Sequence, residues 1–297
     1  MLFRSQQQAD RGEGLLLVDR SGAVRSRLPA PAGATGIAHP RFSPSGDRIA
    51  YVQAAGAQRG SVWVYSLTQG TSQRLSFEGQ AADPAWVPDG RSIGYSLLRP
   101  GGRAVLVVGP ADGAGSPRQV MAAGDHLWQM VFCPRPGDII FRSGNDLFRA
   151  TIGRDTVPVP LLTTRALEEH ATLSPDGRWL AYKSDESGQE EIYVRSYPDM
   201  GPPTLVSIGG GWAPAWSRNG RELVYDGRGS LVAAALRYDG SRPAVTGRTT
   251  LFDVRPYAPA ANRNYDVSRD GERFVMVRGR RPRAVWKVNA LAETPQR

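Results

Sequence analysis

Short apolar runs alternate with turn residues along the whole chain, and residues 173–182 show the repeating unit most clearly. Within this run Pro175 has the φ angle that the second position of a type I turn requires. Gly177 can adopt the positive φ that lets the chain reverse. The apolar segments on either side have the length of β-strands. The run therefore predicts an antiparallel hairpin.

Similar hairpins recur at nearly constant spacing. The residues that close them are Tyr51, Tyr95, Phe141, Tyr182, Tyr225 and Met276. A period of about 45 residues with one hairpin in each unit is typical of a β-propeller, whose blades are four-stranded antiparallel sheets. Six copies predict an all-β fold with six blades. The third copy has its glycine, Gly137, one place later than the others, so we expect an altered turn there.

A third apolar strand is predicted after every hairpin, and a weaker fourth strand after the first five. The third strands are 62–65, 105–108, 147–150, 192–195, 231–235 and 285–288. The fourth strands are 73–75, 118–121, 159–162, 204–206 and 251–254. The sixth unit is therefore incomplete. We expect the early apolar runs 15–18 and 24–28 to close the ring, with the N-terminal strand pairing into the last blade.

The composition favours one repetitive domain. The chain has 297 residues, and its 34 Gly and 23 Pro are scattered at turn-like intervals instead of gathered in a linker. We expect a disordered segment over residues 1–12, a single propeller over 13–290 and a short tail over 291–297. We also expect a monomer.

The formal net charge is +9, and all of the lysine is at Lys183 and Lys287, so nearly all of the positive charge is arginine. This bias is typical of a GC-rich genome, and a basic surface of this kind is more often solvated than bound to a polyanion. No recognised nucleic-acid-binding module accompanies it, so we expect no nucleic-acid partner.

Neither a disulfide nor a membrane span is expected. Cys133 is the only cysteine, which excludes an internal disulfide and a cysteine-based zinc site. No run approaches the roughly 20 apolar residues of a membrane span, and the polar start of the chain lacks the features of a signal peptide.

The fourth unit and the last third of the chain resemble a known family. Residues 180–195, with Ser184, Asp185 and Gly188 at their centre, are similar to the TolB-like, WD-like β-propeller repeats of bacteria. The succession from Leu180 through Phe252 to Phe274 resembles the C-terminal propeller of bacterial eukaryotic-like serine/threonine kinases. The resemblance covers about residues 13–290 and is strongest after position 165.

In that family, catalysis belongs to a separate N-terminal kinase domain, usually followed by a membrane span. This sequence has no glycine-rich loop before a strand lysine, no His-Arg-Asp loop and no Asp-Phe-Gly, so no kinase residue is carried over. The resemblance implies a non-catalytic propeller that serves as a sensor or scaffold and binds a ligand or protein. We expect it to be cytoplasmic if the chain is complete, and periplasmic if it is a fragment of a membrane-spanning kinase.

The sequence lacks the motifs of two classes of propeller enzyme. There is no Gly-x-Ser-x-Gly elbow, and residues 174–179 fail the spacing of the sialidase Asp-box. We therefore predict no catalytic residue, no metal and no cofactor. Two alternatives stay open: a small-molecule hydrolase or lyase with a metal-assisted site at the channel mouth, and an envelope assembly scaffold of the TolB type.

Alignment of the six hairpins shows one position that is mostly polar. It holds His39, Asp83, Gln129, His170, Ala213 and Asn264. All of them precede the innermost strand, so they should surround one mouth of the central channel. Imidazole and carboxylate groups suit divalent cations. However, His39 and His170 come from opposite blades, so we expect these groups to cap loops between blades instead of sharing one ion.

The position one residue earlier carries Trp128, Glu169, Trp212 and Arg263. Two tryptophans that flank a carboxylate are typical of a site for a sugar, peptide or nucleotide-like ligand, although both indoles could instead pack over their own loops. The predicted ligand-binding residues are Trp128, Glu169, His170, Trp212, Arg263, His39 and Asp83. On the same face, Arg280, Arg281 and Arg283 form a basic rim that could orient a protein partner.

Overall fold

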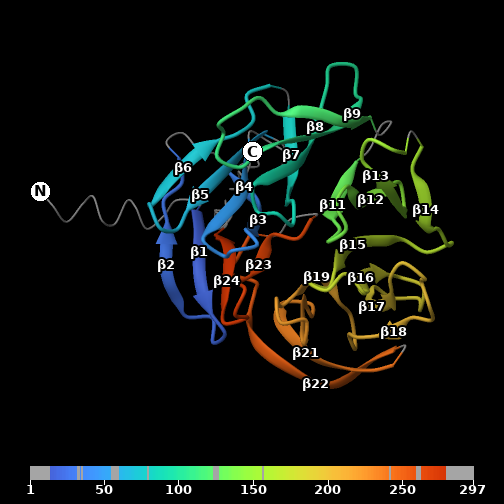
Figure 1. Ribbon diagram of the computed structural model, residues 1–297. Coiled ribbons are helices and arrows are strands. Elements are labelled where there is room, and N and C mark those ends of the chain that lie inside the picture. Colours follow the sequence, from blue (N-terminus) through green and yellow to red (C-terminus); the bar gives the residue numbers. More distant parts are fainter. Residues whose placement is uncertain are drawn as a thin grey trace, which may run out of the picture.

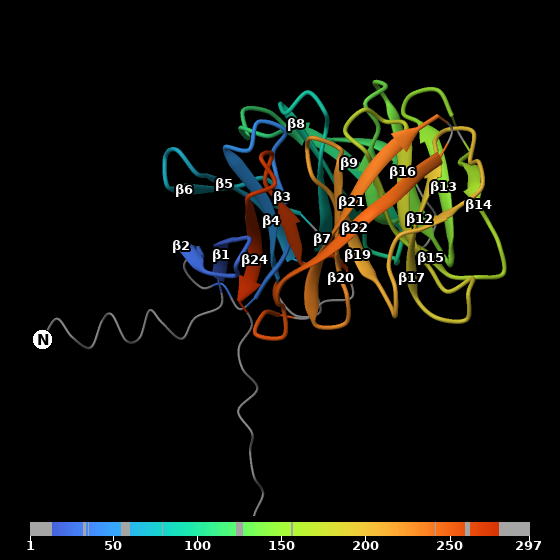
Figure 2. The same ribbon diagram turned by 90° about the horizontal axis from the view of Figure 1, so that it is seen from below.

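In the computed structural model, all regular structure is β. It describes residues 14–31, 34, 36–54, 60–78, 80–122, 127–155, 157–240, 242–258 and 262–278. These residues form strands β1 to β24 and no helix, so they contain no helix able to cross a membrane. The sheets are arranged around a common centre (Figure 1), and Figure 2 shows them from below. The predicted disordered segment 1–12 and the tail 291–297 lie outside the described residues.

Three of the sheets are four-stranded, antiparallel and built from consecutive strands. The first comprises β11 (Trp128–Phe132), β12 (Asp138–Ser143), β13 (Asp146–Thr151) and β14 (Val159–Leu162). The second comprises β15 (Glu168–Leu173), β16 (Trp179–Ser184), β17 (Glu191–Ser196) and β18 (Thr204–Leu205). The third comprises β19 (Trp212–Trp216), β20 (Glu222–Asp226), β21 (Ser230–Asp239) and β22 (Arg242–Asp253).

Another sheet has eight strands and consists of two such groups. One group is β3 (Ile37–Phe42), β4 (Arg48–Ala54), β5 (Gly60–Ser66) and β6 (Thr71–Arg74). The other is β7 (Gln80–Trp86), β8 (Ser92–Leu98), β9 (Ala104–Pro110) and β10 (Arg118–Ala122). The groups are joined where Gly60 pairs with Ala81.

The remaining sheet brings the two ends of the described chain together. Its order is β2 (Val24–Leu28), β1 (Gly14–Asp19), β24 (Arg273–Arg278) and β23 (Tyr265–Val267). Leu16 pairs with Met276, so the pairing expected for the N-terminal strand is present. The sequence predicted residues 285–288 as the third strand of the last unit, next to β24. This prediction is wrong for that position, because β24 pairs with β1 on one edge and with β23 on the other. Residues 285–288 themselves lie outside the described residues.

The geometry of the hairpin turns follows from the turn residues of each unit. In the first, Gly46 N–H donates to the Ser43 carbonyl and Gly46 has a φ of 80°, as a reversal after Pro44 requires. The altered third turn is confirmed: there the bond runs from Asp138 N–H to the Arg135 carbonyl, two residues later than in the other hairpins. The fourth strand predicted for the fifth unit, 251–254, is only the end of β22. β22 begins at Arg242 and pairs with β21 over its whole length.

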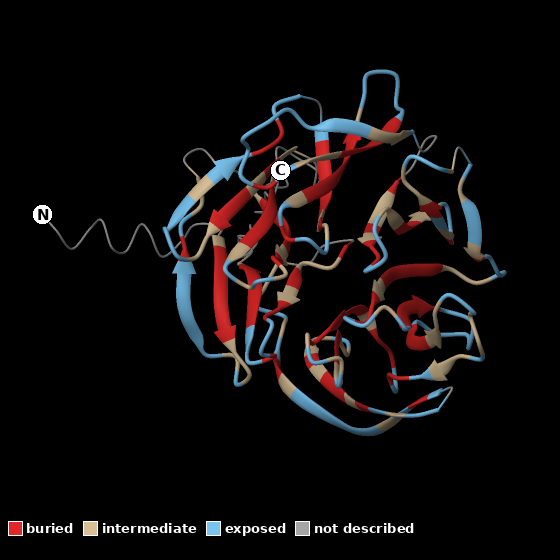
Figure 3. Cartoon of the chain, viewed as in Figure 1, coloured by how far each residue is buried: buried red, intermediate tan, exposed pale blue. Residues whose placement is uncertain are grey.

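The core lies between neighbouring sheets. All six closing residues of the predicted hairpins are buried: Tyr51, Tyr95, Phe141, Tyr182, Tyr225 and Met276. The predicted core residues Trp86 and Trp216 are buried too, and each indole N–H donates to a carbonyl in the preceding group, at Arg41 and Thr172. Figure 3 shows buried residues along the inner strands and exposed ones on the outer strands. Apolar packing and these hydrogen bonds together hold adjacent sheets against each other.

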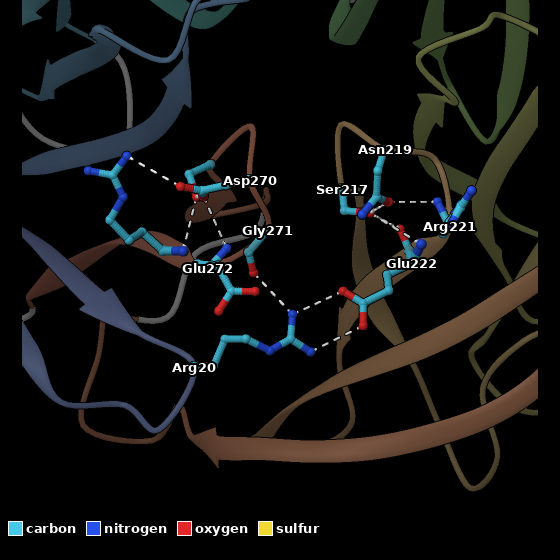
Figure 4. A network of polar contacts seen from close by, with 10 residues as sticks. Arg20, Ser217, Asn219, Arg221, Glu222, Asp270, Gly271 and Glu272 are labelled. Carbon is cyan, nitrogen blue, oxygen red and sulfur yellow. Dashed lines mark hydrogen bonds and ion pairs between the residues drawn. The ribbon is translucent and has the colours of Figure 1, made fainter.

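A polar contact connects the N-terminal strands to β20 and to the turn before β24. The guanidinium of Arg20, directly after β1, forms a two-pronged ion pair with Glu222 of β20, at 2.9 and 3.2 Å. It also donates to the Gly271 carbonyl at 3.0 Å (Figure 4). Arg20 therefore links three segments that are far apart in the sequence.

Candidate functional site

The mostly polar position of the aligned hairpins has an unusual backbone. Five of its six residues lie within the innermost strand, not before it as expected, and have positive φ angles: His39 53°, Asp83 50°, Gln129 54°, His170 55° and Ala213 52°. At each of them the pairing of the innermost strand with the next strand skips two residues, which makes a β-bulge. A bulge redirects side chains and costs backbone strain in non-glycine residues. We call the end of the channel that these five residues surround the bulge face.

Side chains at the bulge face connect one sheet to the next. Nδ1 of His39 lies 3.1 Å from Oδ1 of Asp83, and the amide of Asn262 donates to the same oxygen at 2.8 Å. Gln129 donates to Asn262 at 2.8 Å and accepts the His170 backbone N–H at 2.6 Å. The strained bulges are thereby held by hydrogen bonds across the channel.

His39 and His170 belong to separate clusters. His39 is fully buried beside Asp83, whereas His170 lies beside Glu169 and Trp212. Among the described residues, no group of three or more His, Cys, Asp or Glu side chains lies close enough to hold a metal ion.

Glu169 is the centre of the second cluster. Its carboxylate lies 2.8 Å from Arg142 Nη1 of β12, 2.9 Å from Lys183 Nζ of β16 and 3.5 Å from His170 Nε2. Burial, reinforced by the positive charges of Lys183, Arg263 and Arg142, lowers the pKa of His170 well below its usual value. His170 is therefore neutral at pH 7.

Lys183 joins this cluster to Trp212. Its side chain is 1 % exposed, and Nζ lies 2.6 Å from Glu190 and 3.9 Å from the centroid of the Trp212 ring. A desolvated ammonium over an indole face is a strong cation–π contact. One face of Trp212 is thus covered by Lys183, and the imidazole of His170 lies 4.5 Å away, centroid to centroid.

A cavity of about 490 Å³ lies beside Trp212, at the bulge face. Its lining includes Tyr257 and Tyr265, the amide of Asn262, and the charged groups of Asp226 and Arg255. Burial raises the pKa of Asp226. Its volume and its mixed aromatic and polar lining are those of a small-molecule or peptide site.

The structure divides the predicted ligand-binding residues among four places. Glu169, His170 and Trp212 lie together, and His39 and Asp83 form the buried pair described above. Arg263 lies deeper in the channel, where it donates to the Pro214 carbonyl at 2.8 Å. Trp128 is half-buried opposite Arg142 in β12. The predicted rim of Arg280, Arg281 and Arg283 lies outside the described residues.

Sequence reasoning missed several residues of these clusters: Arg142, Lys183, Tyr257 and Asn262. One signal was available for Lys183, which is one of only two lysines among 37 Lys and Arg residues. The others come from second strands and from the loop before β23, positions that the alignment of innermost strands did not sample.

Comparison with known sequences gives matches over only part of the chain. No family model matches the chain. A stretch of 83 residues, 26 % of the chain, is 30 % identical to the uncharacterized peptidase YuxL of Bacillus subtilis, but it spans only 13 % of that protein.

Solved structures match over most of the chain. A protein of Agrobacterium tumefaciens described as a TolB matches with a TM-score of 0.62 and 18 % identity, covering 90 % of this chain and 97 % of the other. An oligogalacturonate lyase in complex with manganese matches with a TM-score of 0.60 and 14 % identity, covering 92 % and 84 %. At such identities the likeness concerns the fold alone: the chain is an all-β protein with a TolB-like β-propeller fold.

Proposed function

We propose that this chain is a six-bladed, non-catalytic propeller that binds a small ligand or a segment of a protein partner at the bulge face. The observation that carries the proposal is the cavity beside Trp212, which combines aromatic walls with an amide, a carboxyl group and a guanidinium. Such a mixed lining can recognise a ligand by stacking and hydrogen bonding without any reacting group.

Support for six blades comes from the number of four-stranded groups. The eight-stranded sheet counts as two blades because a single residue pair joins its halves, and β1 and β2 complete the blade of β23 and β24. In this arrangement the N-terminal strands close the ring. Closure of this kind removes the exposed strand edges that would otherwise promote aggregation.

The biological setting that we propose is the sensor or scaffold part of a bacterial serine/threonine kinase system. Its support is the sequence resemblance of residues 180–274 to kinase-associated propellers. Sequencing the DNA upstream of codon 1 and mapping the 5′ end of the transcript tests this setting. An in-frame kinase domain would support it, whereas a stop codon with a ribosome site just before Met1 would count against it.

Ligand binding is tested by thermal-shift screening with sugars, nucleotides and short peptides. A saturable rise of the Tm with one class, lost in Trp212→Ala and Tyr257→Ala, is the expected result. The matched control is Phe77→Ala, which removes an aromatic ring that is 73 % exposed. A response that survives both cavity variants would contradict the proposed site.

One observation favours the alternative of a metal-assisted enzyme. Asp83 Oδ2 is buried and makes no hydrogen bond among the described residues, and Oδ1 lies beside His39. A carboxylate with an unused oxygen next to an imidazole is a pair that could bind a divalent ion. Stoichiometric Ca²⁺, Mn²⁺ or Zn²⁺ in the purified protein, lost in His39→Ala or Asp83→Ala, would favour the enzyme. Metal-free protein that still binds a ligand would favour the binding module.

A further inference from the structure

A second cavity occupies the other end of the channel. Its volume is about 340 Å³, and its walls come from the innermost strand or the following turn of all six four-stranded groups. The turn residues Pro44, Pro88, Pro134 and Pro175 surround its opening, so we call this end the hairpin face. The cavity is axial and distinct from the one beside Trp212.

Among the charged residues of the cavity lining, positive charge predominates. The guanidinium groups of Arg41, Arg218 and Arg263 line the cavity, and the only carboxylate in the lining is Asp266. Asp266 is already used: Oδ2 accepts the Phe42 N–H at 2.8 Å, and Oδ1 lies 3.3 Å from Arg263 Nη2. Three cations facing one partly neutralised anion leave an excess of positive charge in a confined space.

The arginines have unused hydrogen-bonding capacity. Arg41 donates to the carbonyls of Pro40 and Arg263, at 2.7 and 2.9 Å, and forms no ion pair with a described carboxylate. Nε of Arg263 is buried and has no hydrogen-bond partner among the described residues. Arg218 has no ion pair within the part of the chain that the structure describes. A guanidinium carries five N–H donors, so these groups can satisfy a further acceptor.

Burial lowers the pKa values of two of these arginines. Burial, with the positive charge of Arg263 next in size, lowers the pKa of Arg41 to about 9. Burial also lowers the pKa of Arg218. Both groups still carry their charge at pH 7, and an anion beside Arg41 and Arg263 would relieve the repulsion between those two.

We propose that the axial cavity binds a small organic anion through its carboxylate or phosphate oxygens, with Arg41, Arg218 and Arg263 as donors. Planar guanidinium groups suit both kinds of oxyanion because they donate two parallel hydrogen bonds. The ligand enters from the hairpin face. Toward the bulge face lies a smaller space of about 40 Å³ beside Gln129 and His170, which is large enough for water but not for an organic anion.

The test is titration calorimetry and thermal shift with inorganic phosphate and with citrate, against glycerol as a neutral probe and NaCl at matched ionic strength. We expect saturable binding of at least one oxyanion and none of glycerol. Arg218→Gln and Arg41→Gln should each weaken binding about tenfold or more, since each removes charge-assisted hydrogen bonds. Arg237→Gln, at a residue 67 % exposed, should leave it unchanged.

The unliganded variants give a second readout. If Arg218 serves a ligand, Arg218→Gln should raise the Tm of the free protein, because it removes a charge that is partly withdrawn from water. Absence of saturable oxyanion binding would overturn the proposal, as would equal binding by Arg218→Gln and the parent protein. Phosphate binding without citrate binding, or the reverse, identifies which oxyanion the cavity takes. Because Trp212 and Tyr257 lie at the other end of the channel, failure of either site leaves the test of the other unaffected.

Discussion

The ammonium group of Lys183 lies 3.9 Å from the centroid of the Trp212 ring. This contact joins β16, the second strand of one sheet, to β19, the first strand of the next. Lys183 is also held by Glu169 and Glu190, at 2.9 and 2.6 Å. A buried lysine of this kind is a structural link between the two sheets.

Replacing this lysine should therefore loosen two blades. We expect Lys183→Met to lower the free energy of unfolding by about 2 kcal/mol, because a buried ion pair and a cation–π contact are lost while Arg142 still neutralises Glu169. Urea denaturation measures the change. Arg237→Met, which breaks an exposed pair with Asp239, is the control and should cost less than about 0.5 kcal/mol. Equal costs for the two variants would contradict the structural role of Lys183.

The buried imidazole of His170 should make stability fall in weak acid. Its pKa is lowered in the folded state, so the unfolded chain binds the proton first as the pH falls below about 6.5. Unfolding is then favoured by up to about 1.4 kcal/mol for each pH unit below that value.

Comparison with a variant isolates this contribution from other titrating groups. The difference in unfolding free energy between the parent protein and His170→Gln should be constant above pH 7 and should shift in favour of the variant between pH 6.5 and 5. Parallel pH profiles for the two proteins would show that His170 does not titrate in this way.

The bulge at Ala213 allows a test by two glycine substitutions in one strand. Ala213 has a φ of 52°, so Ala213→Gly should relieve strain and raise stability by about 0.5 to 1 kcal/mol. Ala215, two residues later and also buried, pairs regularly with Val224, so Ala215→Gly should lower stability by a similar amount. Thermal unfolding measures both changes, and the same sign for both would argue against a strained bulge.

The contact of Arg20 with Glu222 should stabilise the attachment of the N-terminal strands. We expect Arg20→Met to cost about 1 kcal/mol, because two charge-assisted hydrogen bonds are lost from partly exposed groups. Hydrogen exchange in β1 should increase with it. Arg25→Met removes a more exposed pair with Asp19 and should change neither quantity measurably.

Part of the candidate site could be predicted from the hairpin alignment. It identified His39, Asp83 and His170 as equivalent residues of different blades, and all three share the bulge conformation. It did not show that His39 and Asp83 contact each other while His170 lies with Glu169, because adjacent blades meet only after the ring has formed. Arg263 was expected next after Trp212 around the channel mouth. Its carbonyl instead accepts a hydrogen bond from Arg41, since no strand includes Arg263 and the chain enters the channel before β23.

The sequence by itself determined the repeating unit. Turn residues such as Pro175 and Gly177 fix where the chain reverses, and the short run around Tyr182 has the length of a buried strand, because both are local properties of the sequence. Only the tertiary structure decided that Lys183 covers Trp212 and that three arginines meet in the axial cavity. These contacts join residues from separate blades, and their formation depends on loop closure and charge desolvation over the whole ring, which no local pattern encodes.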